Sequence, residues 1–404
     1  MAEYKGIEYL KNRLAAKRSR VQTRYKFYEM KNVTFDFGIS TPPDLRYWMS
    51  TLGWCAKAVD SLADRLAFDR FENDVFDMNG LYLANNKDVL IDSAILGALI
   101  GSCDFIYITA DESGFPLMRV IDGRHATGVI DPTTNMLKEG YAVLEFDESD
   151  RPVVEAYFIP GSTTIIEKGK KPYTVKNDAP YPLLVPVINR PDAVRPFGHS
   201  RISRACMSIV GSAVRTVKRS EIAAEFYSYP QKYILGMDEN AEQMDKWRAS
   251  MSAMLRIDKD EDGDHPVVGQ FQQQSMTPHS EQLRMFAGLF AGETGLTLDD
   301  LGFPSQNPSS AESIKASHES MRLTARKAQT TFGVGLLNAG YLAACVRDKY
   351  PYLRRQVAQT ELKWHPIFEP DAAMLSAIGD GAIKINQALP DYINEQKMKD
   401  LTGI

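Results

Sequence analysis

The chain has 404 residues, 44% apolar and 25% charged, a balance typical of a folded protein with about two to four domains. Its formal net charge of −5 argues against a dedicated sequence-specific DNA-binding protein, which is usually basic. No apolar run approaches the roughly 20 residues of a membrane span, and the N-terminus lacks the apolar stretch of a signal peptide. We therefore expect synthesis in the cytoplasm and no membrane partner.

The cysteines predict neither a disulfide framework nor a zinc site, because they are far apart and form no CxxC pair. We interpret them as reduced core residues, since a free cysteine packs like a small apolar side chain. They are Cys55, Cys103, Cys206 and Cys345.

Helices are predicted over most of the first hundred residues. Residues 5–30 form a basic helix, for which a solvated surface helix is the main interpretation and a nucleic-acid contact the alternative. Residues 87–102 form a helix rich in small residues. Between them, residues 45–71 predict one packed amphipathic helix, because apolar residues recur at spacings of three and four. This apolar stripe contains Trp48, Leu52, Cys55, Val59, Leu62 and Leu66.

From residue 104 to 176 the apolar period changes to two, which indicates short β-strands. Turn sequences such as "ADESG" and "DPTTN" separate these strands. Consecutive strands joined by short turns need no crossover helices, so we expect an antiparallel meander. The following segment, 177–199, is proline-rich and indicates a domain junction.

A long helix is predicted over 200–229, with Ser200 as its cap. Its apolar stripe contains Ile202, Cys206, Ile209, Ala213, Val217 and Ile222. Three cations, Arg204, Arg215 and Lys218, fall within about 60° of one another on another face. A solvated surface is the simplest interpretation of this basic face.

Pro230 ends that helix, and residues 230–277 then predict strand, helix and strand in a small βαβ-like unit. Its acidic turn, "DKDEDGD", lacks the glutamate that a calcium loop requires at its twelfth position. A second helix follows over 278–294, with Pro278 in its first turn.

A polar loop precedes a very long helix, which we expect from Ser310 to Arg347 over roughly 55 Å. Glu319 and Arg322 are spaced to form an ion pair on its exposed half. After Phe332 the helix becomes apolar, so its second half should be buried. A late strand, "ELKWHPIF", and a helical tail complete the chain.

No compact catalytic motif occurs: the chain lacks GxxxxGK[ST], GxSxG, HExxH and GxGxxG. The adjacent carboxylates Asp299 and Asp300 lie in a loop, where a solvated turn is the simplest interpretation. We therefore expect no catalytic residue, no metal and no cofactor, although an active site assembled from distant residues stays open.

Three segments are informative when taken together and in order: "GWCAKAVDSLADRLAFDRF", "PFGHSRIS" and, most specifically, "GETGLTLDDLGFPSQNPSSAESIKASHESM". They resemble the portal proteins of tailed bacteriophages of the siphophage type. The resemblance covers nearly the whole chain and implies an α+β portal fold. Its parts would be a wing (1–199), a first stem helix (200–229), a clip (230–277), a second stem helix (278–294), a tunnel loop (295–310), a long helix with a return strand (311–369) and a short crown (370–404).

The resemblance also implies a ring of about twelve subunits at one capsid vertex, through which double-stranded DNA is packaged and ejected. Its partners would be the terminase large subunit, a head–tail connector, and the major capsid and scaffolding proteins. The channel would be narrowed by uncharged polar residues that do not grip DNA, braced by Phe303 and Pro304. These polar residues are Ser305, Gln306, Asn307, Ser309 and Ser310.

For the first stem helix, the resemblance implies that Ile202, Ile209 and Val217 pack against neighbouring subunits. Its basic face, Arg204, Arg215 and Lys218, would meet either the channel or an acidic neighbour. Two other classes stay open. The first is another ring-forming capsid or tail protein, and the more distant one is a metal-dependent nuclease built from scattered carboxylates.

Overall fold

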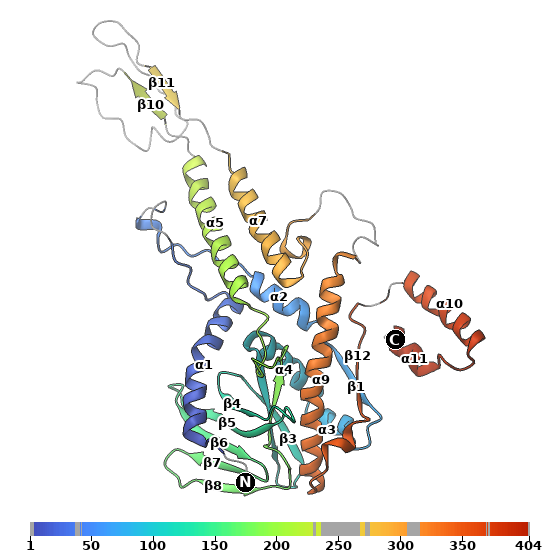
Figure 1. The fold of residues 1–404 in the computed structure, drawn as a ribbon. Coiled ribbons are helices and arrows are strands. Elements are labelled where there is room, and N and C mark those ends of the chain that lie inside the picture. Colours follow the sequence, from blue (N-terminus) through green and yellow to red (C-terminus); the bar gives the residue numbers. More distant parts are fainter. Residues whose placement is uncertain are drawn as a thin grey trace, which may run out of the picture. The chain divides into compact units, whose positions relative to one another are not determined.

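The computed structural model describes residues 4–36, 41, 43–228, 232–235, 267–270, 275–304, 316–368, 370 and 372–402. The chain forms two compact units (Figure 1). The larger contains Met1–Asn32, Gly53–Met207 and Thr294–Ile404, and the smaller contains Val33–Leu52 and Ser208–Glu293. None of the described helices is long and apolar enough to cross a membrane.

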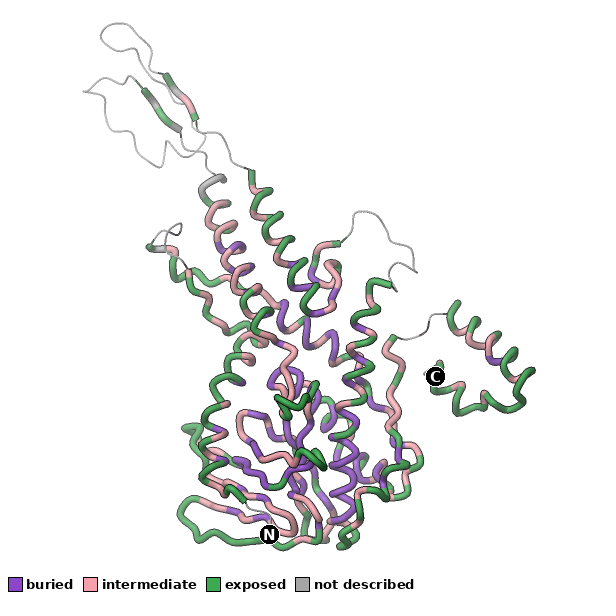
Figure 2. Tube along the Cα trace, viewed as in Figure 1, coloured by how far each residue is buried: buried purple, intermediate pink, exposed green. Residues whose placement is uncertain are grey.

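The core of the larger unit is a three-stranded antiparallel sheet with the strand order β3-β2-β9. These strands are β2 (Cys103–Ala110), β3 (Pro116–Ile121) and β9 (Leu184–Ile188). Helices α4 (Lys87–Gly101) and α9 (Glu319–Asp348) both pack against this sheet. Figure 2 shows the resulting concentration of buried residues.

The second half of α9 is buried, as its apolar sequence predicts, and small residues let it approach its neighbours closely. A Cβ at Gly335 would lie 3.1 Å from the carbonyl oxygen of Pro186 in β9. A Cβ at Gly340 would lie 3.0 Å from the sulfur of Met78, in helix α3 (Met78–Ala84). The hydroxyl of Tyr82 also donates to the carbonyl of Leu336, at 2.6 Å. The exposed half of α9 carries the predicted pair, with Arg322 2.7 Å from Glu319.

A second sheet has five antiparallel strands in sequence order, so the predicted meander is confirmed for residues 126–176 but not for 104–121. Its strands are β4 (Ala126–Ile130), β5 (Leu137–Phe146), β6 (Pro152–Ile159), β7 (Ser162–Glu167) and β8 (Tyr173–Lys176). The N-terminal helix α1 (Ile7–Tyr28) packs on it through Leu10 and Leu14, which join Tyr141 and Val143 in one apolar cluster.

Two glutamates of this sheet fix α1 in place. The carboxylate of Glu139, 1% exposed, accepts the backbone N–H groups of Lys5 and Gly6 at 2.9 and 3.1 Å, and also the Tyr157 hydroxyl. A negative charge is favourable beside the N-terminus of a helix. Glu155 pairs with Lys11 at 2.7 Å and accepts the Tyr141 hydroxyl, and the pKa of Tyr141 is raised, first by burial and then by this hydrogen bond.

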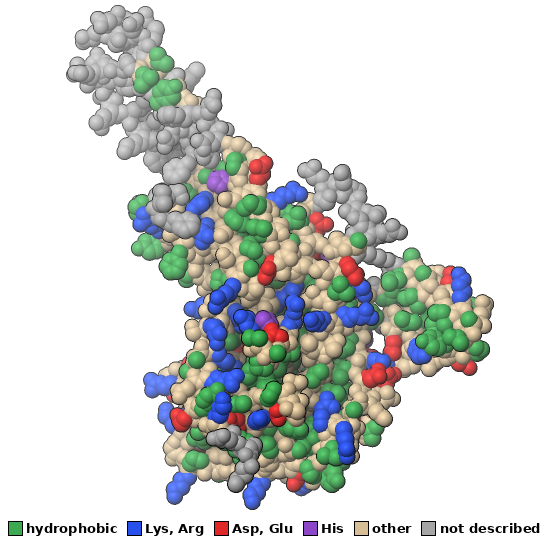
Figure 3. All heavy atoms as spheres, in the orientation of Figure 1, with side chains coloured by type: hydrophobic (Ala, Val, Ile, Leu, Met, Phe, Trp, Pro, Cys, Tyr) green, Lys and Arg blue, Asp and Glu red, His purple; other side chains and the backbone are tan. Residues whose placement is uncertain are grey.

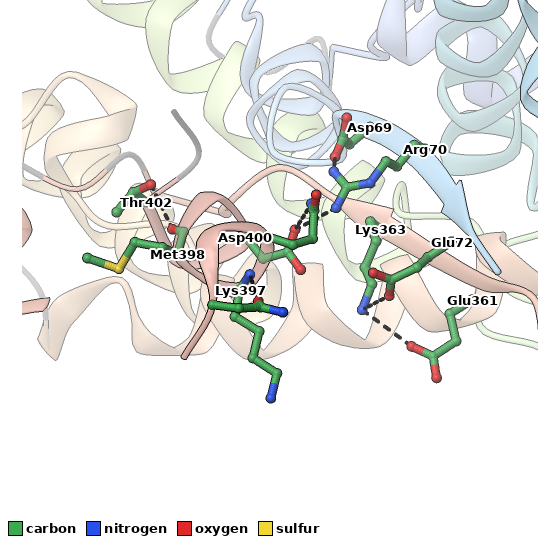
Figure 4. Close-up of polar contacts among 11 residues, drawn as sticks. Asp69, Arg70, Glu72, Glu361, Lys363, Lys397, Met398, Asp400 and Thr402 are labelled. Carbon is green, nitrogen blue, oxygen red and sulfur yellow. Dashed lines mark hydrogen bonds and ion pairs between the residues drawn. The ribbon is translucent and has the colours of Figure 1, made fainter. Parts of the chain in front are cut away.

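The C-terminal helices α10 (Ala372–Ala388) and α11 (Glu395–Thr402) belong to the larger unit. Strand β1 (Phe68–Glu72) pairs with the late strand β12 (Glu361–Trp364), and Arg70 of β1 reaches Asp400 of α11 at 2.7 Å (Figure 4). Lys363 of β12 pairs with Glu72 at 2.8 Å. Of the α10 residues, only Ala382 is buried.

The smaller unit contains helices α5 and α7, a two-stranded sheet and residues 33–52, which we call the arm. Helix α5 (Arg204–Ser228) begins in the larger unit, and α7 (Thr277–Thr294) ends there. The strands β10 (Lys232–Leu235) and β11 (Val267–Gln270) are paired, and the arm includes a short 3-10 turn, η1 (Pro43–Leu45).

Three predictions of the fold need correction. The helix expected over 45–71 is shorter, α2 (Trp54–Ala63), so Trp48 lies in the arm outside it. The strands of 104–176 form two sheets, and β9 lies in the proline-rich segment, because its buried residues pair with β2. Strands β10 and β11 are antiparallel rather than parallel as in a βαβ unit, and the helix expected between them lies outside the described residues.

Two predictions are confirmed by the buried residues. All four cysteines are buried and free, and burial raises the pKa of Cys55 to about 12. The long helix is confirmed from Glu319 to Asp348, whereas the start expected at Ser310 lies outside the described residues.

We predict that Glu139→Gln lowers the stability of the larger unit by about 1–3 kcal/mol. A neutral amide accepts the two backbone N–H groups less strongly and cannot favour the helix terminus by charge. Thermal unfolding followed by circular dichroism measures the change. Glu145→Gln, an exposed position on the same strand, is the matched control, and equal melting temperatures for both variants would contradict the assigned role of Glu139.

Candidate channel and assembly surfaces

The base of the predicted tunnel loop is a tight turn held by its own side chains. Thr297 donates through its backbone N–H and its hydroxyl to Oδ2 of Asp300, both at 2.9 Å. The short helix η2 (Asp299–Leu301) follows and ends at Gly302, whose φ of +87° is a conformation that favours glycine. Asp300 therefore has a structural use, while Asp299 is exposed as expected.

The two bracing residues predicted for this loop lie directly after the turn. Phe303 is half-buried and its backbone N–H donates to the carbonyl of Leu298 at 3.0 Å, whereas Pro304 is exposed. The polar residues expected to face DNA lie outside the described residues. They are Ser305, Gln306, Asn307, Ser309 and Ser310.

The start of α5 differs from the prediction in its cap. The helix begins at Arg204, and the hydroxyl of Ser203 accepts the backbone N–H of Cys206 at 3.1 Å. Ser200 lies before the helix, and its hydroxyl donates to the carbonyl of Ile100 at 2.6 Å. Ser203 therefore satisfies a free N–H of the first turn, and Ser200 joins α5 to α4.

The three residues predicted to pack against neighbouring subunits differ in exposure. Ile202 is 1% exposed within the single chain, so it has almost no surface left to offer a neighbour. Ile209 and Val217 are half-buried and keep part of their apolar surface. The α5 residues that are buried within the single chain instead are Val210 and Val214.

The three cations of the predicted basic face are not equivalent. Arg204 is exposed, and Arg215 is half-buried and donates to the hydroxyl of Ser212 at 2.9 Å. Lys218 is 9% exposed, with its Nζ 3.2 Å from Asp36 and 3.0 Å from the carbonyl oxygen of Arg46. We therefore correct the interpretation of Lys218: it is a satisfied internal cation that fixes the arm to α5.

The arm has a second polar attachment to α5, which the sequence did not indicate. Both the Trp48 indole N–H and the Ser50 hydroxyl donate to Oε2 of Glu221, at 2.9 and 2.7 Å. On the other flank of α5, the hydroxyl of Thr216 donates to Gln282 of α7 at 2.9 Å. The contacts are polar and distant in sequence, so apolar periodicity could not reveal them.

Large apolar side chains are exposed on the smaller unit. In the arm, Phe35 is 85% exposed and Tyr47 89% exposed. On α7, Met285 and Leu289 are both more than half exposed and lie one turn apart on one face. The other exposed large apolar residues described in this unit are Val33, Trp48, Met49, Tyr233, Leu235 and Val267. Exposed apolar groups in such number are typical of a surface that another protein covers.

The described side chains do not assemble a recognisable metal site. Within the part of the chain that the structure describes, no group of three or more His, Cys, Asp or Glu residues could hold a metal ion. The surfaces described above are suited to packing and contact.

Comparison with known proteins shows which proteins this chain resembles. The chain is 23% identical over 327 residues to the portal protein of Mycobacterium phage L5, covering 76% of this chain and 67% of that protein. It is also 23% identical over 333 residues to the portal protein of Mycobacterium phage D29, covering 78% and 68%. No family model matches the chain.

Among solved structures, the chain resembles one in the neck of a native gene transfer agent particle computed with C12 symmetry. The TM-score is 0.50 at 15% identity, with 91% of this chain and 95% of that chain covered. The resemblance to phage portal proteins and the α+β portal fold, both predicted from the sequence, are confirmed.

We predict that Lys218→Met releases the arm from α5. The change removes the ammonium group that pairs with the carboxylate of Asp36, whose side chain is 16% exposed. We expect the free energy of unfolding to fall by about 2 kcal/mol, less than the loss when a fully buried ion pair is broken. Limited trypsin digestion followed by mass spectrometry should show faster cleavage after Arg46. Arg204→Met, an exposed cation on the same helix, should leave that rate unchanged, and equal rates for both variants would show that Lys218 does not hold the arm.

Proposed function

We propose that this chain is a portal protein, the subunit of a ring at one vertex of a phage-like capsid. The observation that carries this proposal is the similarity of about three quarters of the chain to two phage portal proteins. The chain would act in the virion, after assembly in the host cytoplasm.

The ring would contain about twelve copies around a channel for double-stranded DNA. The fold likeness to a chain from a neck computed with C12 symmetry supports this number. The exposed apolar side chains of the arm and α7 support extensive contact between copies, because a closed ring buries two different patches of each subunit against its neighbours.

The parts of the chain would divide the work of a portal. Residues 295–310, anchored by the Thr297–Asp300 turn, would line the narrowest part of the channel. Helices α5 and α7 flank β10 and β11, an order that fits a stem carrying a clip at its end. The clip would dock the terminase large subunit and later the head–tail connector, while the wing would meet the major capsid and scaffolding proteins.

The chain would contribute shape and surface to DNA passage, without chemistry of its own. The sequence contains no GxxxxGK[ST] loop to hold a nucleoside triphosphate, so we infer that a separate ATPase supplies the energy for packaging. Uncharged polar residues in the loop would let a polyanion pass, because every phosphate neutralised by a cation adds to its affinity for the wall.

We predict that Ile209→Asp prevents ring formation. The side chain is half-buried in the single chain, and a carboxylate buried there by a neighbour would lose its hydration without a partner. Light scattering on a sizing column should show about 540 kDa for a ring of twelve 45.3 kDa chains, and smaller species for the variant.

Ser208→Asp, an exposed position one residue away and on a different face, is the control and should still form rings. If the Ile209→Asp variant still forms rings, Ile209 does not lie in the interface between subunits. A wild-type chain that remains at 45.3 kDa at high concentration would contradict the proposed function itself.

A further inference from the structure

Two segments of the larger unit, helix α1 and the residues just before α5, converge on the C-terminal end of α4. The side chain of Arg24 in α1 donates to the carbonyl oxygen of Gly101 at 2.8 Å. The backbone N–H of Arg201 donates to the carbonyl oxygen of Leu99, also at 2.8 Å. Ser200 adds the bond to Ile100 already described. The last carbonyls of a helix have no partner within it and favour nearby cations, so this end of α4 holds α1 and the start of α5 together.

This convergence collects four arginines, Arg20, Arg24, Arg195 and Arg204, which we call the arginine cluster. Arg20, Arg195 and Arg204 are exposed, and Arg24 is half-buried. The pKa of Arg24 is lowered, first by burial and then by the positive charges of the other three. On the face drawn in Figure 3, Lys and Arg side chains gather where α1 ends and α5 starts.

The protein provides little negative charge to offset this cluster. Arg20 and Arg204 form no ion pair with any residue in the described ranges. Asp192 is close in sequence to Arg195, but its carboxylate is engaged by His199 at 2.5 Å and by the backbone N–H groups of Val194 and Arg195. In contrast, Arg18, two residues before Arg20 on α1, is paired with Asp150 at 3.3 Å.

The chain carries a net charge of −5, so the positive arginine cluster is a local exception to its overall charge. The like charges within the cluster repel one another. An external anion would remove the repulsion. Besides Arg18 and Lys26, the exposed α1 residues around Arg20 and Arg24 are Ser19, Gln22 and Thr23. They lack the aromatic and methionine side chains that mark the centre of a protein interface, which favours a phosphate ligand over an acidic protein.

We propose that the arginine cluster binds backbone phosphates of double-stranded DNA, outside the tunnel loop. This inference rests on the proposed function, which makes DNA the polyanion that each ring meets. Guanidinium groups offer paired N–H donors that match phosphate oxygens, and Arg20 and Arg24 lie one helical turn apart. Because phosphates carry no sequence information, the contact is independent of DNA sequence.

The test uses the full chain as assembled rings and a labelled duplex of mixed sequence, about 30 base pairs long, with binding measured by fluorescence anisotropy across a salt series. Each phosphate contact contributes about −0.9 to the slope of log affinity against log salt concentration. The double variant Arg20→Gln/Arg204→Gln should weaken binding at least about tenfold and make the slope less steep by about 2.

The charge-matched control is Arg18→Gln/Arg355→Gln, which removes two exposed arginines outside the cluster and should leave affinity and slope near the wild-type values. Light scattering on the same samples reports ring formation separately from DNA binding. If wild-type rings do not bind the duplex, the proposal is overturned, and the result points to an acidic protein partner. Equal binding by the cluster variant and the control would also overturn it, while the ring itself would stand.

Discussion

The burial of one half of α9 is the constraint on which the larger unit depends. The helix can lie against β9 and α3 only because Gly335 and Gly340 have no side chain at the points of closest approach. Its second half is nearly all buried, whereas its first half is polar and only partly buried. A well-packed interior resists deformation, so this half of α9 gives the exposed half a rigid base.

The same unit secures its N-terminal helix mainly by charge. Glu139 and Glu155 bind α1 at its first turns, and Arg24 binds it to the end of α4 near its last turns. A basic helix on a protein of net negative charge is thus held at both ends by complementary groups, and the arginines not used in this way remain available to an outside anion.

In the smaller unit, polar contacts hold the arm while its apolar side chains remain exposed. Lys218 and Glu221, a little less than one turn apart on α5, each receive a different part of the arm. The arm is therefore fixed within one chain before its aromatic residues meet any partner. An ordered surface loses less conformational entropy on association, which suits the ring assembly proposed above.

The resemblance to phage portal proteins rests on sequence order and on fold, and neither depends on a catalytic site. The proposed role in DNA passage would require surfaces of defined shape and adhesion, and such surfaces carry no short motif. This explains why the informative features of the sequence are long segments, such as the stretch from Gly292 to Met321.

Local sequence alone indicated the helices over 5–30, 87–102 and 278–294, the meander over 126–176, the buried cysteines and the apolar half of α9, because periodicity and turn chemistry act over a few residues. It did not determine that β9 pairs with β2, that Trp48 lies outside the helix and donates to Glu221, or that Lys218 is an internal cation. It also could not show that Arg20, Arg195 and Arg204 gather around Arg24. Those features are contacts between residues tens to hundreds of positions apart, and only the folded chain brings their charges and backbone groups within reach of one another.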